Sequence, residues 1–201
     1  MENNNYLISF VMGTRPEAIK LAPLILEFKK FKKIKINIAL SGQHEDMIKS
    51  VMDIFDLKED INLNILKRSI SLDQSISLIL SELSVFFDDL KPDIVFVQGD
   101  TITAFAGALA AFLKSIPVAH IEAGLRTENI YSPFPEEANR RMISQLTRLH
   151  FSPTKIAYEN LINNGINKDV FISGNTVVDA LNLVSKKIND FNIKNIDIYK
   201  E

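Results

Sequence analysis

Four acidic residues of this chain stand where they could transfer protons. Asp100 and Glu122 each follow a short apolar run directly, and Glu136 and Glu137 lie together in PFPEEANRR. Positioned carboxylates act as general acids and bases. Arg15, in GTRPE, stands just before a predicted helix, where backbone N–H groups already favour an anion. These residues indicate a site of carboxylates and cations, although Arg15 could equally be an exposed loop arginine.

Structural roles would also explain each carboxylate. Asp100 precedes a predicted helix and could be its N-cap, a role worth about 1 kcal/mol. Glu122 ends an apolar strand, where an unpaired carboxylate is costly, and Arg126 could be its partner. Glu136-Glu137 would complement the dipole of the helix they open, and arginines follow four residues later at salt-bridge spacing. Spacing by itself leaves both explanations open.

The three histidines do not share the spacing of metal ligands. His120 and His150 fall in predicted strands and are expected in the core or at the sheet edge. His44 lies in a loop at the predicted ligand edge and is a possible contact. Walker loop, Ser-His-Asp and zinc patterns are all absent from the sequence. We therefore predict neither a metal nor a cofactor.

The stretch from residue 94 to 126 must position Asp100 and Glu122. It reads as an apolar strand ending at Gly99, an Ala-rich helix, and a second strand that begins after Pro117. Such a unit requires a parallel sheet with a right-handed crossover. Ligands of open α/β sheets bind beyond the carboxyl ends of the strands. Both carboxylates should therefore lie at the ligand edge.

Strand and helix patterns alternate through the rest of the chain. Further strands are predicted at 6–12, 36–40, 61–65, 149–152 and 170–172, and helices at 46–55, 71–90, 155–163 and 177–188. A helix should also follow Pro16, and Pro23 should kink or interrupt it. This alternation predicts an α/β fold with a doubly wound, mostly parallel, Rossmann-like sheet.

Composition excludes several classes of protein. The 201 residues carry a formal charge of −2, which gives no support to binding nucleic acid or membrane surfaces. There is no cysteine, so disulfide and thiolate chemistry are excluded. No apolar run approaches the ~20 residues of a membrane span. We expect a cytoplasmic protein.

Several longer motifs together resemble one enzyme family. They are GTRPEAIKLAPL, SGQH, QGDT, PVAHIEAGLRT, YSPFPEEANR, HFSPT and SGNTVVDAL. They extend over nearly all of residues 10–181 and resemble the UDP-N-acetylglucosamine 2-epimerases of the non-hydrolysing bacterial type. The resemblance implies the first domain of a glycosyltransferase-B-like, two-domain fold. It also implies interconversion of UDP-GlcNAc and UDP-ManNAc for cell-surface polysaccharide biosynthesis.

The resemblance also implies roles for single residues. The family's reaction eliminates UDP across C1–C2 to give 2-acetamidoglucal and then adds it back, with the C2 proton delivered to the opposite face. By resemblance, the acid/base set is Asp100, Glu122 and Glu136. The implied substrate-binding residues are Arg15, Lys20, Gln43, His44 and Arg140, with Arg15 and Lys20 on the phosphate side and Arg140 orienting a carboxylate.

The family has a second Rossmann-like domain, which carries most of the uridine pocket. We therefore expect residues 1–172 to form the N-terminal domain and 173–201 to form a hinge and the start of an incomplete second domain. The implied partners are UDP-N-acetylglucosamine, this missing nucleotide-binding domain and, in the full-length form, a second copy in a homodimer. The isolated chain should fold but show no turnover. The alternatives are a hydrolysing epimerase that releases ManNAc and UDP, and a non-catalytic truncated domain.

Overall fold

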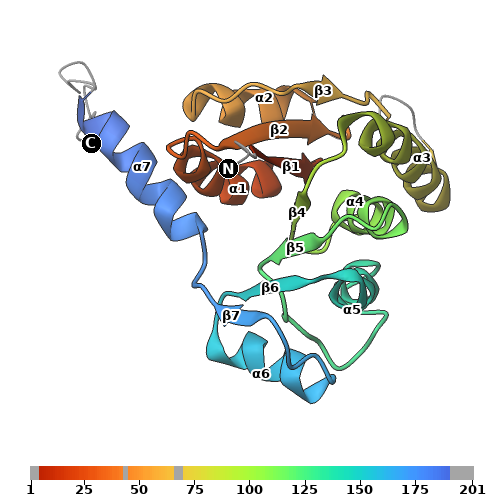
Figure 1. Cartoon of the computed structure of the whole chain (residues 1–201). Coiled ribbons are helices and arrows are strands. Elements are labelled where there is room, and N and C mark those ends of the chain that lie inside the picture. The colour runs from red at the N-terminus through yellow and green to blue at the C-terminus, as the bar shows by residue number, and fades with distance from the viewer. Residues whose placement is uncertain (1–4, 43–44, 66–69, 191–201) are drawn as a thin grey trace, which may run out of the picture.

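The computed structural model describes residues 5–42, 45–65 and 70–190, which form one sheet covered by helices on both faces (Figure 1). No helix in these ranges is long and apolar enough to cross a membrane. The strands are β1 (Tyr6–Met12), β2 (Ile34–Leu40), β3 (Ile61–Asn62), β4 (Ile94–Gln98), β5 (Val118–Ile121), β6 (Leu149–Ser152) and β7 (Val170–Ile172). The helices are α1 (Arg15–Phe28), α2 (Glu45–Ile54), α3 (Leu72–Leu90), α4 (Ile102–Leu113), α5 (Glu136–Leu146), α6 (Lys155–Asn163) and α7 (Val177–Asp190).

The seven strands pair in parallel in the order β3-β2-β1-β4-β5-β6-β7. The chain builds from β1 out to β3, returns to place β4 beside β1, and then continues to β7. This order confirms the predicted doubly wound α/β fold. The strand order reverses between β1 and β4, and in such sheets the ligand crevice lies at the carboxyl ends of the strands that flank this point.

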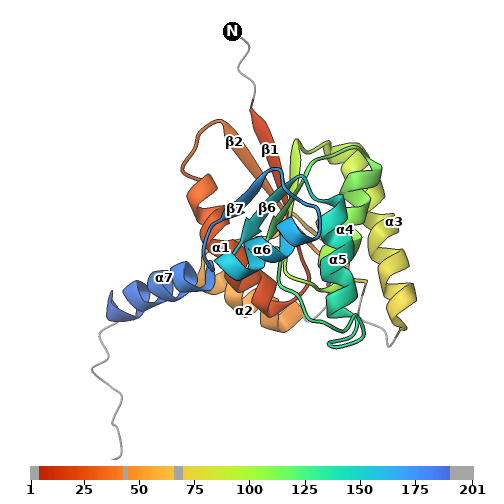
Figure 2. The same cartoon turned by 90° about the horizontal axis from the view of Figure 1, so that it is seen from below.

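Alternate residues of β1 face two separate cores. Ile8, Phe10 and Met12 pack with α1 and α2, whereas Val11 packs with α3 and α4. Because successive side chains of a strand point to opposite faces, a strand buried on both sides is apolar throughout. Figure 2 shows the result, with α1 and α2 on one side of the sheet and α3, α4 and α5 on the other.

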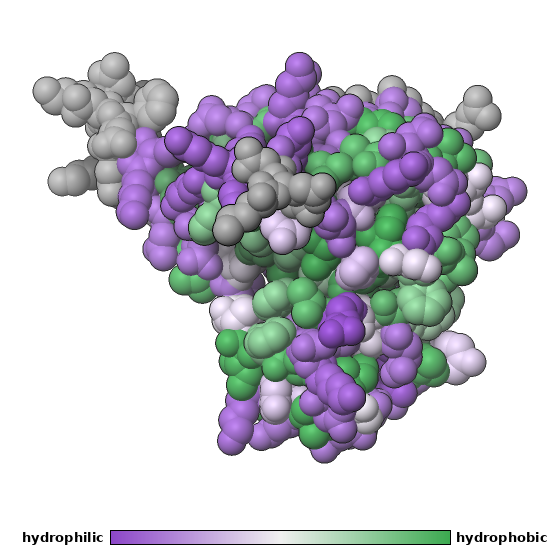
Figure 3. All heavy atoms as spheres, in the orientation of Figure 1, coloured by the Kyte–Doolittle hydropathy of each residue, from purple (hydrophilic) through white to green (hydrophobic). Residues whose placement is uncertain are grey.

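A row of aromatic rings crosses the α1 side of the sheet. The ring of Phe96 stacks on Phe10, with centroids 5.0 Å apart, and on Phe151 at 6.5 Å, and Phe151 stacks on Phe171 at 5.6 Å. Phe10 is fully buried, but Phe171 is 47% exposed. The α1 side is therefore less completely covered toward β7. Figure 3 shows hydrophobic residues at the surface among hydrophilic ones.

Three local predictions were wrong. Helix α1 runs through Pro23 without interruption, because Pro23 is buried with Leu21 and Ile25 and this packing outweighs one lost hydrogen bond. The strand predicted at 61–65 ends at Asn62, and Asn64 has a left-handed φ of 53°, although the N–H groups of Leu63 and Ile65 still donate to the carbonyls of Leu40 and Ser41. Arg15 does not precede α1 but is its first residue, and Thr14 occupies the N-cap position.

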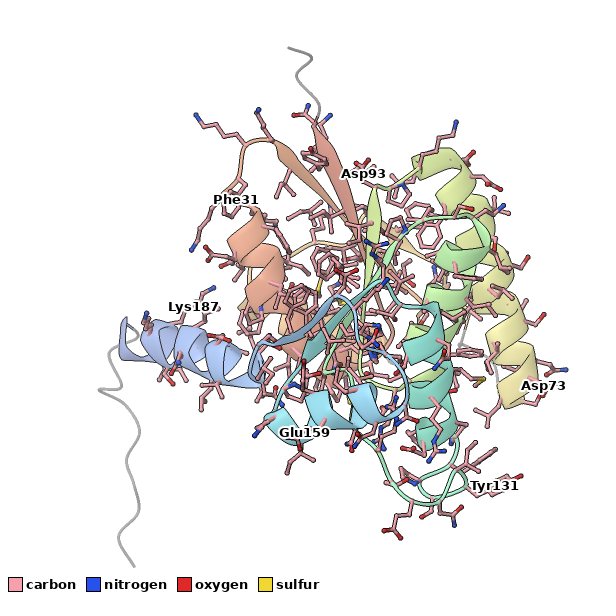
Figure 4. The ribbon with its side chains drawn as sticks, turned by 60° about the horizontal axis from the view of Figure 1, so that its bottom comes forward. Phe31, Asp73, Asp93, Tyr131, Glu159 and Lys187 are labelled. Atoms are coloured by element: carbon pink, nitrogen blue, oxygen red, sulfur yellow. The ribbon has the colours of Figure 1, made fainter. Side chains whose placement is uncertain are left out.

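Helix α7 follows β7 and packs back on α1. Ala180 is buried, and Leu183 and Val184 pack against the same core as α1 and α2. The Lys187 ammonium also reaches the Asp56 carboxylate at 2.5 Å and the carbonyl of Ile54 at 2.7 Å; Figure 4 labels Lys187 on α7. The sheet ends at the predicted boundary, residue 172, but the division into two domains stays a prediction.

Two buried histidines sit opposite each other in the neighbouring strands β5 and β6. His120 and His150 are register partners and are 1% and 2% exposed. Burial lowers the pKa of His120 to about 3 and that of His150 to about 4. Neutral His120 therefore donates its Nε2–H to the carbonyl of Gly99, 2.7 Å away, while its Nδ1 has no partner among the described residues. This bond fixes the turn that follows β4.

The neutral state of His120 makes the stability of the chain dependent on pH. As the pH drops below 6.5, the imidazole is protonated in the unfolded chain but stays neutral in the folded chain until about pH 3. The unfolding free energy therefore decreases as the pH decreases through this window. Between pH 7 and 5 the wild type should lose about 2 kcal/mol of unfolding free energy more than His120→Gln. Glutamine keeps an N–H donor for Gly99 but does not titrate. Urea unfolding at both pH values measures the difference, and equal losses would contradict a neutral buried His120.

A second prediction concerns Gly124, in the loop after β5. Its φ is +91°, and an added Cβ would lie 2.0 Å from the backbone oxygen of Ala157 in α6. Gly165 has a similar φ of +82° but open space around it. Gly165→Ala should therefore cost about 1 kcal/mol, for backbone strain alone. Gly124→Ala should cost ~3 kcal/mol or more, because overpacking adds to that strain. Urea unfolding of both variants tests this, and equal costs would show that α6 moves aside freely.

Candidate active site

A pocket of about 380 Å³ lies where the strand order reverses. The turns after β1, β4 and β5 line it together with the first turns of α1. Its lining residues are Thr14, Arg15, Pro16, Glu17, Lys20, Met47, Gln98, Gly99, Asp100, Thr101 and Glu122. Four of the residues predicted to act at the site, Arg15, Lys20, Asp100 and Glu122, thus meet in one pocket. Of the other predicted residues, Glu136 and Arg140 stand on α5, and Gln43 and His44 lie outside the described residues.

The buried carboxylate of Glu17 joins the turns on either side of the reversal point. Its Oε2 accepts hydrogen bonds from the backbone N–H groups of Gly13 (2.9 Å) and Thr14 (2.6 Å) and from the Thr14 hydroxyl (2.7 Å). Its Oε1 accepts from the hydroxyl of Thr101, at 2.7 Å. Burial raises the pKa of Glu17, and these four donors act in the opposite direction. The T-x-x-E spacing of Thr14 and Glu17 is the signature of the capping box that forms at the start of α1.

Asp100 forms an ion pair and is not an N-cap. The cap of α4 is Thr101, whose hydroxyl oxygen accepts from the N–H of Ala104. The Asp100 Oδ2 instead accepts from Nε and Nη2 of Arg140, at 2.8 and 2.6 Å, and Asn139 donates to the Asp100 carbonyl at 2.8 Å. Helix α5 is thereby held against the turn after β4.

Glu122 adopts a left-handed backbone conformation, with a φ of 67°. Such conformations cost roughly 1–2 kcal/mol in a residue with a side chain and cluster at functional sites. Its Oε2 accepts from Lys20 Nζ at 2.5 Å and Gln98 Nε2 at 2.6 Å, and its Oε1 accepts from Asn175 Nδ2 at 3.0 Å. The alternative pairing of Glu122 with Arg126 is wrong, because Arg126 bonds to Ser144 and to the Leu125 carbonyl.

Adjacent glutamates on α5 have different environments. Glu137 is fully buried and accepts from Arg140, Arg141 and the Thr127 N–H. Of the salt bridges predicted at four-residue spacing, the one between Glu137 and Arg141 forms, whereas Arg140 pairs with Asp100 and Glu137. Burial alone would raise the pKa of Glu137, but these donors outweigh it and lower the pKa. Glu136 is half-buried and makes no hydrogen bond or ion pair within the described part of the chain. Glu137 is therefore structural, and Glu136 is the carboxylate left available.

Electrostatics links the three carboxylates that were predicted as the acid/base set. The pKa of Asp100 is raised, mainly by burial; Arg140 opposes this rise, and the charges of Glu136 and Glu122 add to it. The charges of Glu136 and Glu122 are therefore close enough to Asp100 to disfavour its ionised form. A raised pKa makes Asp100 a better proton donor than an ordinary exposed carboxylate, which is ionised at neutral pH.

The cationic side of the pocket is provided by α1. Arg15 is exposed, and its guanidinium has no hydrogen-bond or ion-pair partner within the described residues. The N–H groups of Gly13 and Thr14, which would otherwise attract an anion to this helix terminus, are already occupied by Glu17. An anion at this end of the pocket would therefore meet mainly Arg15 and the helix dipole. In the described ranges no three His, Asp or Glu side chains are grouped to hold a metal ion.

Comparisons with known proteins agree with this arrangement. The family model for UDP-N-acetylglucosamine 2-epimerase matches residues 26–200. The UDP-N-acetylglucosamine 2-epimerase of Neisseria meningitidis serogroup A is 49% identical over 185 residues, which are 92% of this chain and 50% of that protein. The enzyme of the same name from Bacillus subtilis strain 168 is 51% identical over 173 residues, 86% of this chain and 46% of that protein.

Solved structures give the same picture. A crystal structure of the Neisseria meningitidis UDP-GlcNAc 2-epimerase bound to UDP-GlcNAc has a TM-score of 0.88 and 48% identity, and the match covers 94% of this chain and 51% of the other. The MurG of Acinetobacter baumannii, at 13% identity and a TM-score of 0.56, shares the fold alone. These neighbours confirm the predicted glycosyltransferase-B-like domain. The chain spans about half the length of the relatives that it matches, and it belongs to the UDP-N-acetylglucosamine 2-epimerase family.

Proposed function

We propose that this chain forms the acid/base half of a UDP-N-acetylglucosamine 2-epimerase. The observation that carries the proposal is the grouping of Asp100 and Glu122 with Arg15 in the pocket at the reversal point of the sheet, where the charge of Glu136 also acts on Asp100. In this proposal UDP-GlcNAc binds across the pocket, and the relatives' second half supplies most of the uridine site. We further propose a cytoplasmic homodimer in its full-length form, serving cell-surface polysaccharide biosynthesis, with no metal or cofactor.

The proposed reaction needs a base, an acid and charge neutralisation. One carboxylate removes the C2 proton, the C2–H electrons form the C1–C2 double bond, and the C1–O bond breaks to release UDP. The reverse addition delivers a proton to the opposite face of C2, so groups on both faces are required. Arg15 offsets the charge of the leaving diphosphate. Lys20 and Arg140 hold Glu122 and Asp100 in place through the ion pairs described above.

Two rival functions use the same residues differently. A hydrolysing epimerase would add water at C1 and release ManNAc and UDP. A non-catalytic domain would bind a ligand without converting it. Asp100 has a raised pKa and lies near the charges of Glu122 and Glu136, and this favours proton transfer over binding alone.

A chimera with a relative tests the proposal. Residues 1–190 of this chain would be joined to the remaining half of the Neisseria meningitidis relative, whose first half has the same fold. The chimera should convert UDP-GlcNAc to a mixture with UDP-ManNAc and should incorporate deuterium at C2 in deuterated water. The isolated 201-residue chain should show neither activity, because the partner half is needed for the nucleotide.

The controls separate the alternatives. A chimera carrying both Asp100→Asn and Glu122→Gln, purified in parallel, reports activity from contaminating host enzyme. Release of free ManNAc and UDP would favour the hydrolysing function. A folded chimera that binds UDP-GlcNAc but never exchanges the C2 proton would contradict the proposal.

The adjacent glutamates of α5 provide a matched test of the acid/base assignment. In the chimera, Glu136→Gln should lower turnover by ~10²–10⁴ and change the unfolding free energy by less than about 1 kcal/mol. Asp100→Asn and Glu122→Gln should lower turnover in the same range. Glu137→Gln should instead cost about 3 kcal/mol of stability, because two arginines lose a buried charged partner. Undiminished turnover and C2 exchange in all three of the first variants would place the acid/base groups in the other half.

A further inference from the structure

The side-chain amide of Asn175 forms hydrogen bonds through both its oxygen and its nitrogen. This residue lies between β7 and α7, and its Oδ1 accepts from the N–H of Val177 in the first turn of α7, at 3.1 Å. Its Nδ2 donates to Glu122 Oε1 at 3.0 Å. The two partners fix the orientation of the amide, since an N–H requires the oxygen and a carboxylate requires the nitrogen. Asn175 thus joins the start of α7 directly to Glu122.

The two oxygens of Glu122 are held by different parts of the structure. Lys20 from α1 and Gln98 from β4 both bind Oε2. Among the described residues, only Asn175 binds Oε1. The Glu122 carboxylate is mostly buried, with 12% of its side chain exposed, and its backbone is in the left-handed region. Rotation of the carboxyl group is therefore restrained on one side by the sheet and α1, and on the other by the segment that leads into α7.

Helix α7 is itself attached to the domain. Ala180 is buried against the α1 core, and Lys187 pairs with Asp56 beyond the end of α2. Because α7 packs against α1, which carries Lys20, a shift of α7 along α1 would move Asn175 without moving Lys20. The hydrogen bonds of Glu122 would then change at Oε1 alone.

We propose that Asn175 is a positioning residue that ties the N-terminus of α7 to the Glu122 carboxylate. The inference rests on the proposed function in one respect, namely that Glu122 takes part in proton transfer. The position of α7 then determines whether Oε1 is held in the geometry needed for that transfer. A misplacement of about 1 Å in a reacting group is enough to lower a rate ~10²-fold.

The test begins with the 201-residue chain, where no activity is needed. Asn175→Ser keeps a side-chain oxygen that can accept from the N–H of Val177, but its side chain is too short to reach Glu122. A double-mutant cycle with Glu122→Gln in urea unfolding should show a coupling of roughly fivefold in the folding equilibrium constant. Effects that multiply within about twofold would overturn the inference, because the two side chains would then be independent.

The second arm measures turnover in the chimera described above. Asn175→Asp also keeps an acceptor for the N–H of Val177 but places a carboxylate against Oε1, and it should lower kcat by 10- to 100-fold while KM changes less than about threefold. The matched control is Asn164→Asp at the end of α6, an exposed amide outside the pocket, which should keep wild-type rates. A wild-type kcat for Asn175→Asp would overturn the positioning role. An inactive wild-type chimera combined with intact coupling in the first arm would instead refute the proposed function and support the link between α7 and Glu122.

Discussion

One buried carboxylate supports the architecture of the site. Glu17 lies where the sheet reverses direction, and its two oxygens bind the turn after β1 on one side and Thr101, at the start of α4, on the other. These turns belong to neighbouring strands that are separated in sequence by α1, β2, α2, β3 and α3. Without a group that accepts from both, the turns would present unpaired N–H and O–H donors to the protein interior, which is costly. The spacing between Arg15, the first residue of α1, and Asp100, in the turn after β4, depends on this contact.

The remaining polar groups at the pocket are organised in pairs that cross between elements. Asp100 with Arg140 joins the turn after β4 to α5, and Glu122 with Lys20 joins β5 to α1. His120 contributes from within the sheet by holding the carbonyl of Gly99. Asp100 and Glu122 are therefore each oriented by a residue on another element. The geometry of the site depends on the packing of α1 and α5 on the sheet.

The sequence predicted the fold well because each element carries its own local signal. Apolar runs ending at glycine marked β1 and β4, and the order of elements required a parallel sheet. The failures were also local in origin. Pro23 was expected to kink or interrupt α1, but α1 continues through it because Pro23 is buried.

The site was less accessible to sequence reasoning, because its contacts join residues far apart in the chain. Lys20 is 102 residues from Glu122, and Asn175 is 53 residues from it, so no spacing rule could have paired them. Resemblance to a family supplied the identities of the acidic residues but not their partners. It also could not show that Glu137 is paired with two arginines while the side chain of its neighbour Glu136 has no partner among the described residues.

The backbone at Glu122 has a consequence for how this domain would respond to selection. Its left-handed conformation is one that glycine adopts without strain and glutamate does not. The backbone conformation at residue 122 would by itself favour glycine over glutamate. Glycine would remove that strain, but Lys20, Gln98 and Asn175 would then lose their common acceptor. Selection for stability at this position would therefore weigh a relaxed backbone against three lost hydrogen bonds.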